Sequence, residues 1–140
     1  AFPIVKRIQE AMGKNLCFVF RNFPLSQVHP HAEAAAEAVE AAAAQGKFAE
    51  MHDIIFENQD RLEPQDLLDY AQKVGLDTKR FVEEMESGTY EERVREDFMS
   101  GVRSGVNGTP TFFVNGQRYD DSWDYAPLLS HLQRAAHRPA

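Results

Sequence analysis

The stretch G-V-N-G-T-P-T-F-F-V-N-G, from Gly105 to Gly116, is the most informative part of this 140-residue sequence. Its apolar run Thr111–Val114 is typical of a β-strand, and the following Asn115-Gly116 is the strongest short signal for a hairpin turn. Thr109-Pro110 stands at the entrance of this strand. An X-Pro bond at such a place can be cis, which leaves neighbouring backbone groups available to pair with a ligand. The alternative from physics alone is a trans proline that simply begins the strand.

The N-terminal part predicts one helix and one strand. Pro3 suits the first turn of a short amphipathic helix that Gly13 ends. Residues 16–21 form a near-continuous apolar run, the pattern of a strand buried on both faces. Cys17 lies inside this run, so we expect a buried structural thiol, because apolar surroundings suppress the thiolate.

From His29 to Gly105 the pattern is almost wholly helical. Nine of the thirteen residues from 32 to 44 are alanine, which predicts a helix that packs closely through small side chains. Its acidic residues are expected to face solvent: Glu33, Glu37 and Glu40. Apolar residues at helical spacing predict further helices beginning near Phe48, at Pro64, after Asp77 and near Val94, and a terminal helix carrying Trp123, Leu128, Leu129 and Leu132.

The composition excludes several classes of protein. Fifteen lysine and arginine residues against 22 acidic residues give a net charge of −7, so the chain lacks the basic footprint of a nucleic-acid-binding protein. No apolar run is long enough to insert this domain into a membrane. The single cysteine excludes an intrachain disulfide and a C-x-x-C pair.

Other candidate chemistry is weak. His29-Pro30-His31 and His52-Asp53 contain zinc-ligand residue types, but histidines two apart around a proline do not share a helix face, so surface or packed histidines are the better interpretation. We therefore expect no metal and no cofactor. The sequence contains neither a G-x-S-x-G elbow nor a glycine-rich phosphate loop that opens a helix.

Several motifs together resemble the DsbA-like thioredoxin family, in particular the bacterial subgroup that also occurs fused to sodium/proton antiporters. The motifs are F-V-F-R-N-F-P-L (Phe18–Leu25), H-P-H-A (His29–Ala32), the segment Gly46–Gln59, M-E-S-G (Met85–Gly88) and Gly105–Gly116. They occur in the expected order along nearly the whole chain. The resemblance implies an α/β thioredoxin-like fold over residues 1–140: a small mixed sheet with a large helical insertion at about residues 29–105.

The resemblance also implies a function and a site. Thr109 and Pro110 would form a cis-proline loop that binds a peptide or a thiol/disulfide protein substrate. The family exchanges thiols and disulfides through C-x-x-C at the start of the first helix. Ala1-Phe2-Pro3 resembles the stretch shortly after that motif, so we expect the motif and the strand before it to lie upstream of Ala1. Cys17 matches no catalytic position, and the chain as written is expected to be inactive in thiol exchange.

The same resemblance also suggests alternative functions and a partner. One alternative is a non-catalytic module that binds peptides at the cis-proline loop. A weaker one is a glutathione-dependent transferase or isomerase. Without the first strand the sheet has an unpaired edge, which favours a homodimer. The family is largely extracytoplasmic, and the sequence itself leaves the compartment open.

Overall fold

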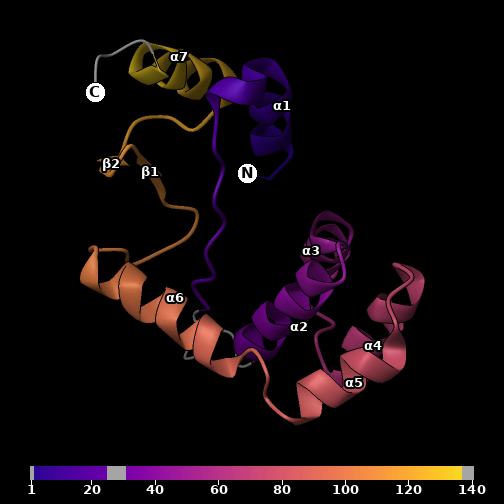
Figure 1. Cartoon of the computed structure of the whole chain (residues 1–140). Helices are drawn as coiled ribbons and strands as arrows, with labels where there is room; N and C mark the ends of the chain where they lie inside the picture. The colour runs from indigo at the N-terminus through magenta and orange to yellow at the C-terminus, as the bar shows by residue number, and fades with distance from the viewer. Residues whose placement is uncertain (1, 25–30, 137–140) are drawn as a thin grey trace. The chain divides into compact units, whose positions relative to one another are not determined.

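A computed structural model describes residues 2–24 and 31–136 (Figure 1). The chain divides into two compact units, each described here by itself: the first unit, Ala1–Phe20 with Gly108–Ala140, and the helical unit, Arg21–Asn107. The single domain expected over residues 1–140 stays a prediction. The insertion expected at about residues 29–105 lies within the helical unit, and His29 and Pro30 fall outside the described residues.

The first unit has a small apolar core between two helices and a hairpin. Its elements are α1 (Phe2–Met12), the 3₁₀ turn η1 (Gly13–Asn15), β1 (Phe112–Val114), β2 (Gln117–Tyr119) and α7 (Tyr125–Ala136). Helices α1 and α7 pack together (Figure 1). The core consists of Ile8, Met12, Tyr119 and Leu128. Trp123, which was expected in the terminal helix, precedes α7 and is 39% exposed.

The expected hairpin is confirmed. Strands β1 and β2 are antiparallel, with Phe112 opposite Tyr119 and Val114 opposite Gln117. Asn115 and Gly116 both have positive φ, +49° and +82°, as a type I′ turn requires. Tyr119 is buried and its hydroxyl donates a hydrogen bond to the backbone carbonyl of Ser122.

The expectation of a strand at residues 16–21 was wrong. In the described chain this segment is extended but belongs to no sheet. Its residues alternate along the segment: Leu16 and Phe18 are half-buried, whereas Cys17 and Val19 are exposed. The expectation of a buried thiol at Cys17 was therefore wrong, because only one face of the segment is covered.

The helical unit is built around its alanine-rich helix. The elements are α2 (Ala32–Ala44), α3 (Phe48–Glu57), α4 (Pro64–Lys73), α5 (Thr78–Glu86) and α6 (Glu91–Arg103). Helix α2 contacts each of the other four (Figure 1). Ala38, Ala41 and Ala42 are fully buried in the core, together with Met51 of α3.

Local signals place the helix starts as expected. Pro64 occupies the first turn of α4, and Glu63 and Asp66 form a reciprocal capping box at its N-terminus. Asp77 caps α5 by accepting a hydrogen bond from the Arg80 amide at 3.2 Å. These caps satisfy amide groups that the first turn of each helix leaves without an intrahelical partner.

The acidic residues of α2 do not all face solvent. Glu33 is exposed, but Glu37 is buried and the Glu40 side chain is only 11% exposed. Burial raises the pKa of Glu37, and the nearby charges of Glu91 and Glu33 raise it further. The expectation for this helix face was wrong because α6 packs against α2 and covers it.

Three consecutive residues anchor the chain to α2 and α6 where it enters the helical unit. Arg21 donates to the Ser100 hydroxyl at 3.1 Å. The buried Asn22 side chain donates to Glu40 at 2.7 Å, and its backbone amide donates to Asp97 at 3.2 Å. The Phe23 ring stacks on Phe98, with 4.7 Å between the ring centroids. Polar and aromatic contacts therefore fix the entry segment together.

Charge is divided unequally between the two units. Residues 21–107 contain nine lysine and arginine residues and eighteen acidic residues, a net charge of −9. The remaining six basic and four acidic residues leave the first unit at +2. Within the described residues, no helix is both long and apolar enough to cross a membrane.

Replacing Gly101 with alanine should destabilise the helical unit. An added Cβ would lie 2.7 Å from the Phe23 ring, which the stack on Phe98 holds in place. Overpacking should outweigh the better helix propensity of alanine and leave a net loss of about 1–2 kcal/mol in a urea titration. Gly108→Ala is the control, since nothing lies within 4 Å of its added Cβ. Equal stability of the two variants would contradict this packing.

Replacing Glu37 with glutamine should stabilise the protein at neutral pH. The folded pKa of Glu37 lies above the unfolded value of 4.5. The contribution of Glu37 to the free energy of unfolding is therefore fully present below about pH 4.5, where the carboxyl group is protonated, and is lost as the pH rises through the folded pKa. Glu37→Gln removes this loss. The stability that the variant gains over the wild type should therefore shrink on acidification. Thermal unfolding at several pH values measures the difference, with the exposed Glu50→Gln as control. A less stable Glu37→Gln at neutral pH would refute the assignment.

Cys17 should react with iodoacetamide in the native protein. Its side chain is exposed and it is the only cysteine, so mass spectrometry of the intact chain reports a single site. We expect alkylation in native buffer to proceed at about the rate found in denaturant, within a factor of about ten. Alkylation that requires denaturant would show that the thiol is buried after all.

Candidate functional site: the Thr109–Pro110 loop

The two residues singled out in the sequence lie in an exposed loop before β1. The peptide bond between Thr109 and Pro110 is cis, the isomer that the resemblance implies. Both residues are exposed. The Thr111 hydroxyl donates to the Gly108 carbonyl at 2.7 Å and so bridges the loop from one side of the pair to the other. This side-chain bond fixes the loop without using the peptide groups of Thr109 or Pro110.

The loop continues into a strand with an open edge. Among the residues that the structure describes, β1 pairs only with β2. In a two-residue hairpin the pair that flanks the turn, Val114 and Gln117, is hydrogen-bonded, so the peptide groups of Phe113 point to the opposite edge. The Phe113 side chain is itself 43% exposed. An unpaired donor, an unpaired acceptor and an apolar ring therefore lie close to the loop in sequence.

Gly108 leaves additional space at the loop. Its φ lies outside the left-handed region, and an added Cβ would meet no atom of the described residues within 4 Å. The described protein therefore needs glycine here neither for its backbone conformation nor for its packing. A glycine with these properties permits close approach of another backbone.

The loop offers hydrogen bonds and surface but no thiol. Thr109 and Pro110 carry no side chain that titrates near neutral pH, and the chain contains one cysteine, whereas a dithiol cycle needs two. A groove of about 740 Å³ between the ends of α1 and α7, lined by Met12, Asn15, Ser130 and Arg134 among others, does not include the loop.

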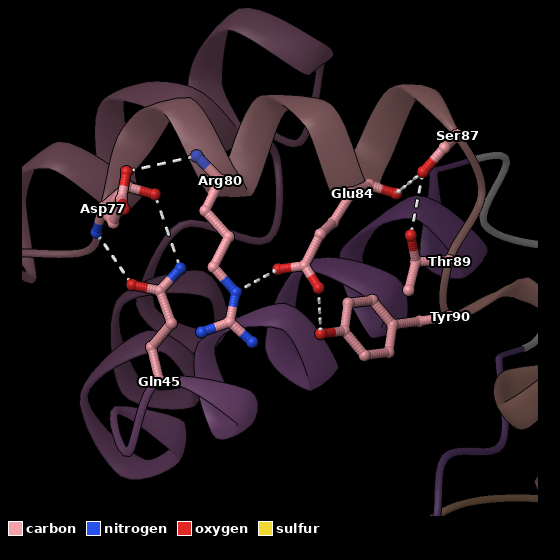
Figure 2. Close-up of polar contacts among 7 residues, drawn as sticks. All are labelled: Gln45, Asp77, Arg80, Glu84, Ser87, Thr89 and Tyr90. Atoms are coloured by element: carbon pink, nitrogen blue, oxygen red, sulfur yellow. Dashed lines mark hydrogen bonds and ion pairs between the residues drawn. The ribbon is translucent and has the colours of Figure 1, made fainter.

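The M-E-S-G motif ends α5 with Met85 and Glu86 and begins the following turn with Ser87 and Gly88. Figure 2 shows Glu84 accepting from both Arg80, at 3.0 Å, and the Tyr90 hydroxyl, while Ser87 and Thr89 hydrogen-bond to each other. Burial raises the pKa of Tyr90, and its hydrogen bond to Glu84 adds to this effect. Only the bond between Glu84 and Tyr90 joins α5 to the residue that precedes α6, and the other two contacts lie within α5 or within the turn after it.

A second contact in Figure 2 ties the end of α2 to the start of α5. The Asp77 backbone amide donates to the Gln45 side-chain carbonyl at 2.8 Å, and the Gln45 side-chain amide donates to the Asp77 carbonyl at 3.4 Å. The sequence analysis predicted a helix that begins after Asp77 but gave no role to Gln45. The Asn22 anchor was missed in the same way, because a long-range polar contact has no local pattern.

The histidines do not form a metal centre in the described chain. His31 is exposed at the start of α2, and His52 stacks between Phe48 and Phe56 on α3, with ring centroids 5.6 and 6.2 Å away. No cluster of three or more potential ligands occurs within residues 2–24 and 31–136. His29 lies outside the described residues.

Known relatives contain a segment that is similar to this chain as part of a longer sequence. It is 46% identical over 121 residues to Na(+)/H(+) antiporter NhaA 1 of Salinispora arenicola, which covers 86% of this chain and 19% of the relative. It is 40% identical over 131 residues to Na(+)/H(+) antiporter NhaA 1 of Mycobacterium sp. (strain KMS), covering 92% and 21%. The chain thus spans about a fifth of the length of these relatives.

The match to a protein family covers most of the chain. No solved structure matches it significantly. The family model of the DsbA-like thioredoxin domain, however, matches residues 3–133. The helices, the hairpin and the loop described above fit the α/β thioredoxin-like fold with a helical insertion. The chain belongs to the family of DsbA-like thioredoxin domains.

Proposed function

We propose that this domain holds an extended polypeptide segment at the Thr109–Pro110 loop and along the adjoining edge of β1. The observation that carries the proposal is the combination of an exposed loop at Thr109 and Pro110 with a strand edge that has no partner in the described chain. An extended peptide can add to such an edge as a further strand, because main-chain hydrogen bonds supply the affinity.

The arrangement around the loop supports this mode of binding. The Phe113 peptide groups offer a donor and an acceptor on the open edge, and the Phe113 ring offers apolar surface beside them. Gly108 leaves room for the backbone of the ligand. The Thr111 hydroxyl already occupies the Gly108 carbonyl, so the loop is held in place before a ligand arrives.

Within the family, the bound segment would belong to a thiol- or disulfide-containing protein. Thiol–disulfide exchange needs a thiolate that attacks and a second thiol that resolves the mixed disulfide. The single Cys17 cannot fill both roles. The role that we propose for these 140 residues is therefore to bind and position the segment, and the exchange chemistry would require thiols from outside them.

A titration with a defined peptide tests the proposal. A capped hexapeptide of alternating valine and threonine is added to the ¹⁵N-labelled chain, and amide shifts are followed by NMR. We expect saturable shifts at Thr109, Thr111 and Phe113. Gly108→Ala should keep the fold and weaken binding by about tenfold, roughly 1.4 kcal/mol, because the added methyl group enters the space of the ligand. Gln117→Ala, on the opposite edge of the hairpin, is the matched control and should bind normally.

Two results would count against the proposal. One is the absence of shifts at the loop, and the other is an unchanged affinity in Gly108→Ala. A second copy of the chain could occupy the same edge and form the homodimer expected from the sequence. Sedimentation velocity on the peptide-free protein distinguishes this case, because a dimer that the hexapeptide dissociates places the second copy on the peptide edge.

A further inference from the structure

The loop before β1 contains one of two Asn-Gly dipeptides in the chain. These are Asn107-Gly108 and Asn115-Gly116. At such a dipeptide the glycine amide nitrogen can attack the side-chain amide of the preceding asparagine, because glycine has no side chain to shield its nitrogen. The two dipeptides have the same chemistry, so any difference in their reactivity comes from the fold.

The fold holds Asn115 in a conformation that cannot react. Its φ of +49° places it in the left-handed region, where ψ is about +47°. At this ψ the Gly116 nitrogen lies anti to the Asn115 Cβ, turned away from the side-chain amide. Asn115 also lies inside the two-residue turn that the Val114–Gln117 pair closes. Ring closure therefore requires the hairpin to open.

In the part of the chain that the structure describes, no comparable constraint holds Asn107. It is exposed and lies in no helix or strand. Among the described residues, neither the Asn107 nor the Gly108 amide donates to another backbone group. Gly108 has no positive φ, and no described residue lies within 4 Å of the place that a Cβ would take. The one fixed group is the Gly108 carbonyl, which accepts the Thr111 hydroxyl and takes no part in ring closure.

We propose that Asn107 is a site of spontaneous deamidation and that the hairpin protects Asn115. The Gly108 nitrogen attacks the Asn107 Cγ, so a C–N bond forms as the bond from Cγ to the side-chain nitrogen breaks. Ammonia leaves and takes up the proton from the Gly108 nitrogen. Water then opens one of the two C–N bonds of the succinimide ring, which gives aspartate or isoaspartate at position 107. No electron transfer is involved.

The product changes the chain two residues before Thr109. Either form adds a negative charge there, and isoaspartate also lengthens the main chain by one methylene. The modification thus alters the loop by a slow chemical step that needs no enzyme. It depends on the conformation of residues 107 and 108 alone and stands whether or not the loop binds a peptide.

Mass spectrometry tests the proposal with both sites in one experiment. The purified chain is kept in mildly alkaline buffer, sampled over time and digested with trypsin. Both asparagines fall in the peptide that follows Arg103 and ends at Arg118, and tandem fragmentation separates them. In the folded protein we expect the acid form to accumulate at position 107 at least about ten times faster than at position 115, the ratio for a hairpin opening free energy of about 1.4 kcal/mol.

Two controls separate the conformational effect from the sequence effect. In denaturant the two sites should react at similar rates. Gly108→Ala, which fits the described backbone, should suppress the reaction at position 107 and leave position 115 unchanged. Equal rates at both sites in the folded chain, or reaction at both sites only in denaturant, would overturn the proposal. Unchanged reaction at position 107 in Gly108→Ala would exclude the succinimide route.

Discussion

The close packing around α2 is the constraint on which the helical unit depends. Four helices contact α2, and this is feasible only because most of its side chains are methyl groups. Ala38, Ala41 and Ala42 are fully buried and leave no space between the helix backbone and its neighbours. A larger side chain at any of them would push at least one helix away, since protein interiors are packed as densely as organic crystals.

The same crowding explains the polar contacts of α2. A helix with a neighbour on nearly every side has little surface left for charged residues, so Glu37 and Glu40 lie under α6 and the entry segment. Glu40 is satisfied there by Asn22 and by Arg93, which lies 3.1 Å away. Burial raises the pKa of Glu37, and the nearby carboxylates of Glu91 and Glu33 raise it further. Tight packing thus determines both the apolar and the polar environment of this helix.

Much of the fold could be predicted from local patterns, and the exceptions share one cause. Pro64, Asp77 and Asn115-Gly116 act through their own backbone, so the sequence predicts their caps and turn directly. The burial of Cys17 and of Glu37 depends on which distant segment covers each face, and no local pattern records that. The loop residues Thr109 and Pro110 and an unpaired sheet edge were expected from the motifs, but the free space at Gly108 became visible only in three dimensions.

Because charge is divided unequally, the two units remain charged at the isoelectric point of the chain. At the pI of about 5.2 the chain as a whole is neutral, yet its helical unit remains anionic and its first unit cationic. Neighbouring molecules then attract each other through unlike units, in addition to losing their mutual repulsion. Solubility near the isoelectric point should therefore increase when salt is added, because screening weakens that attraction.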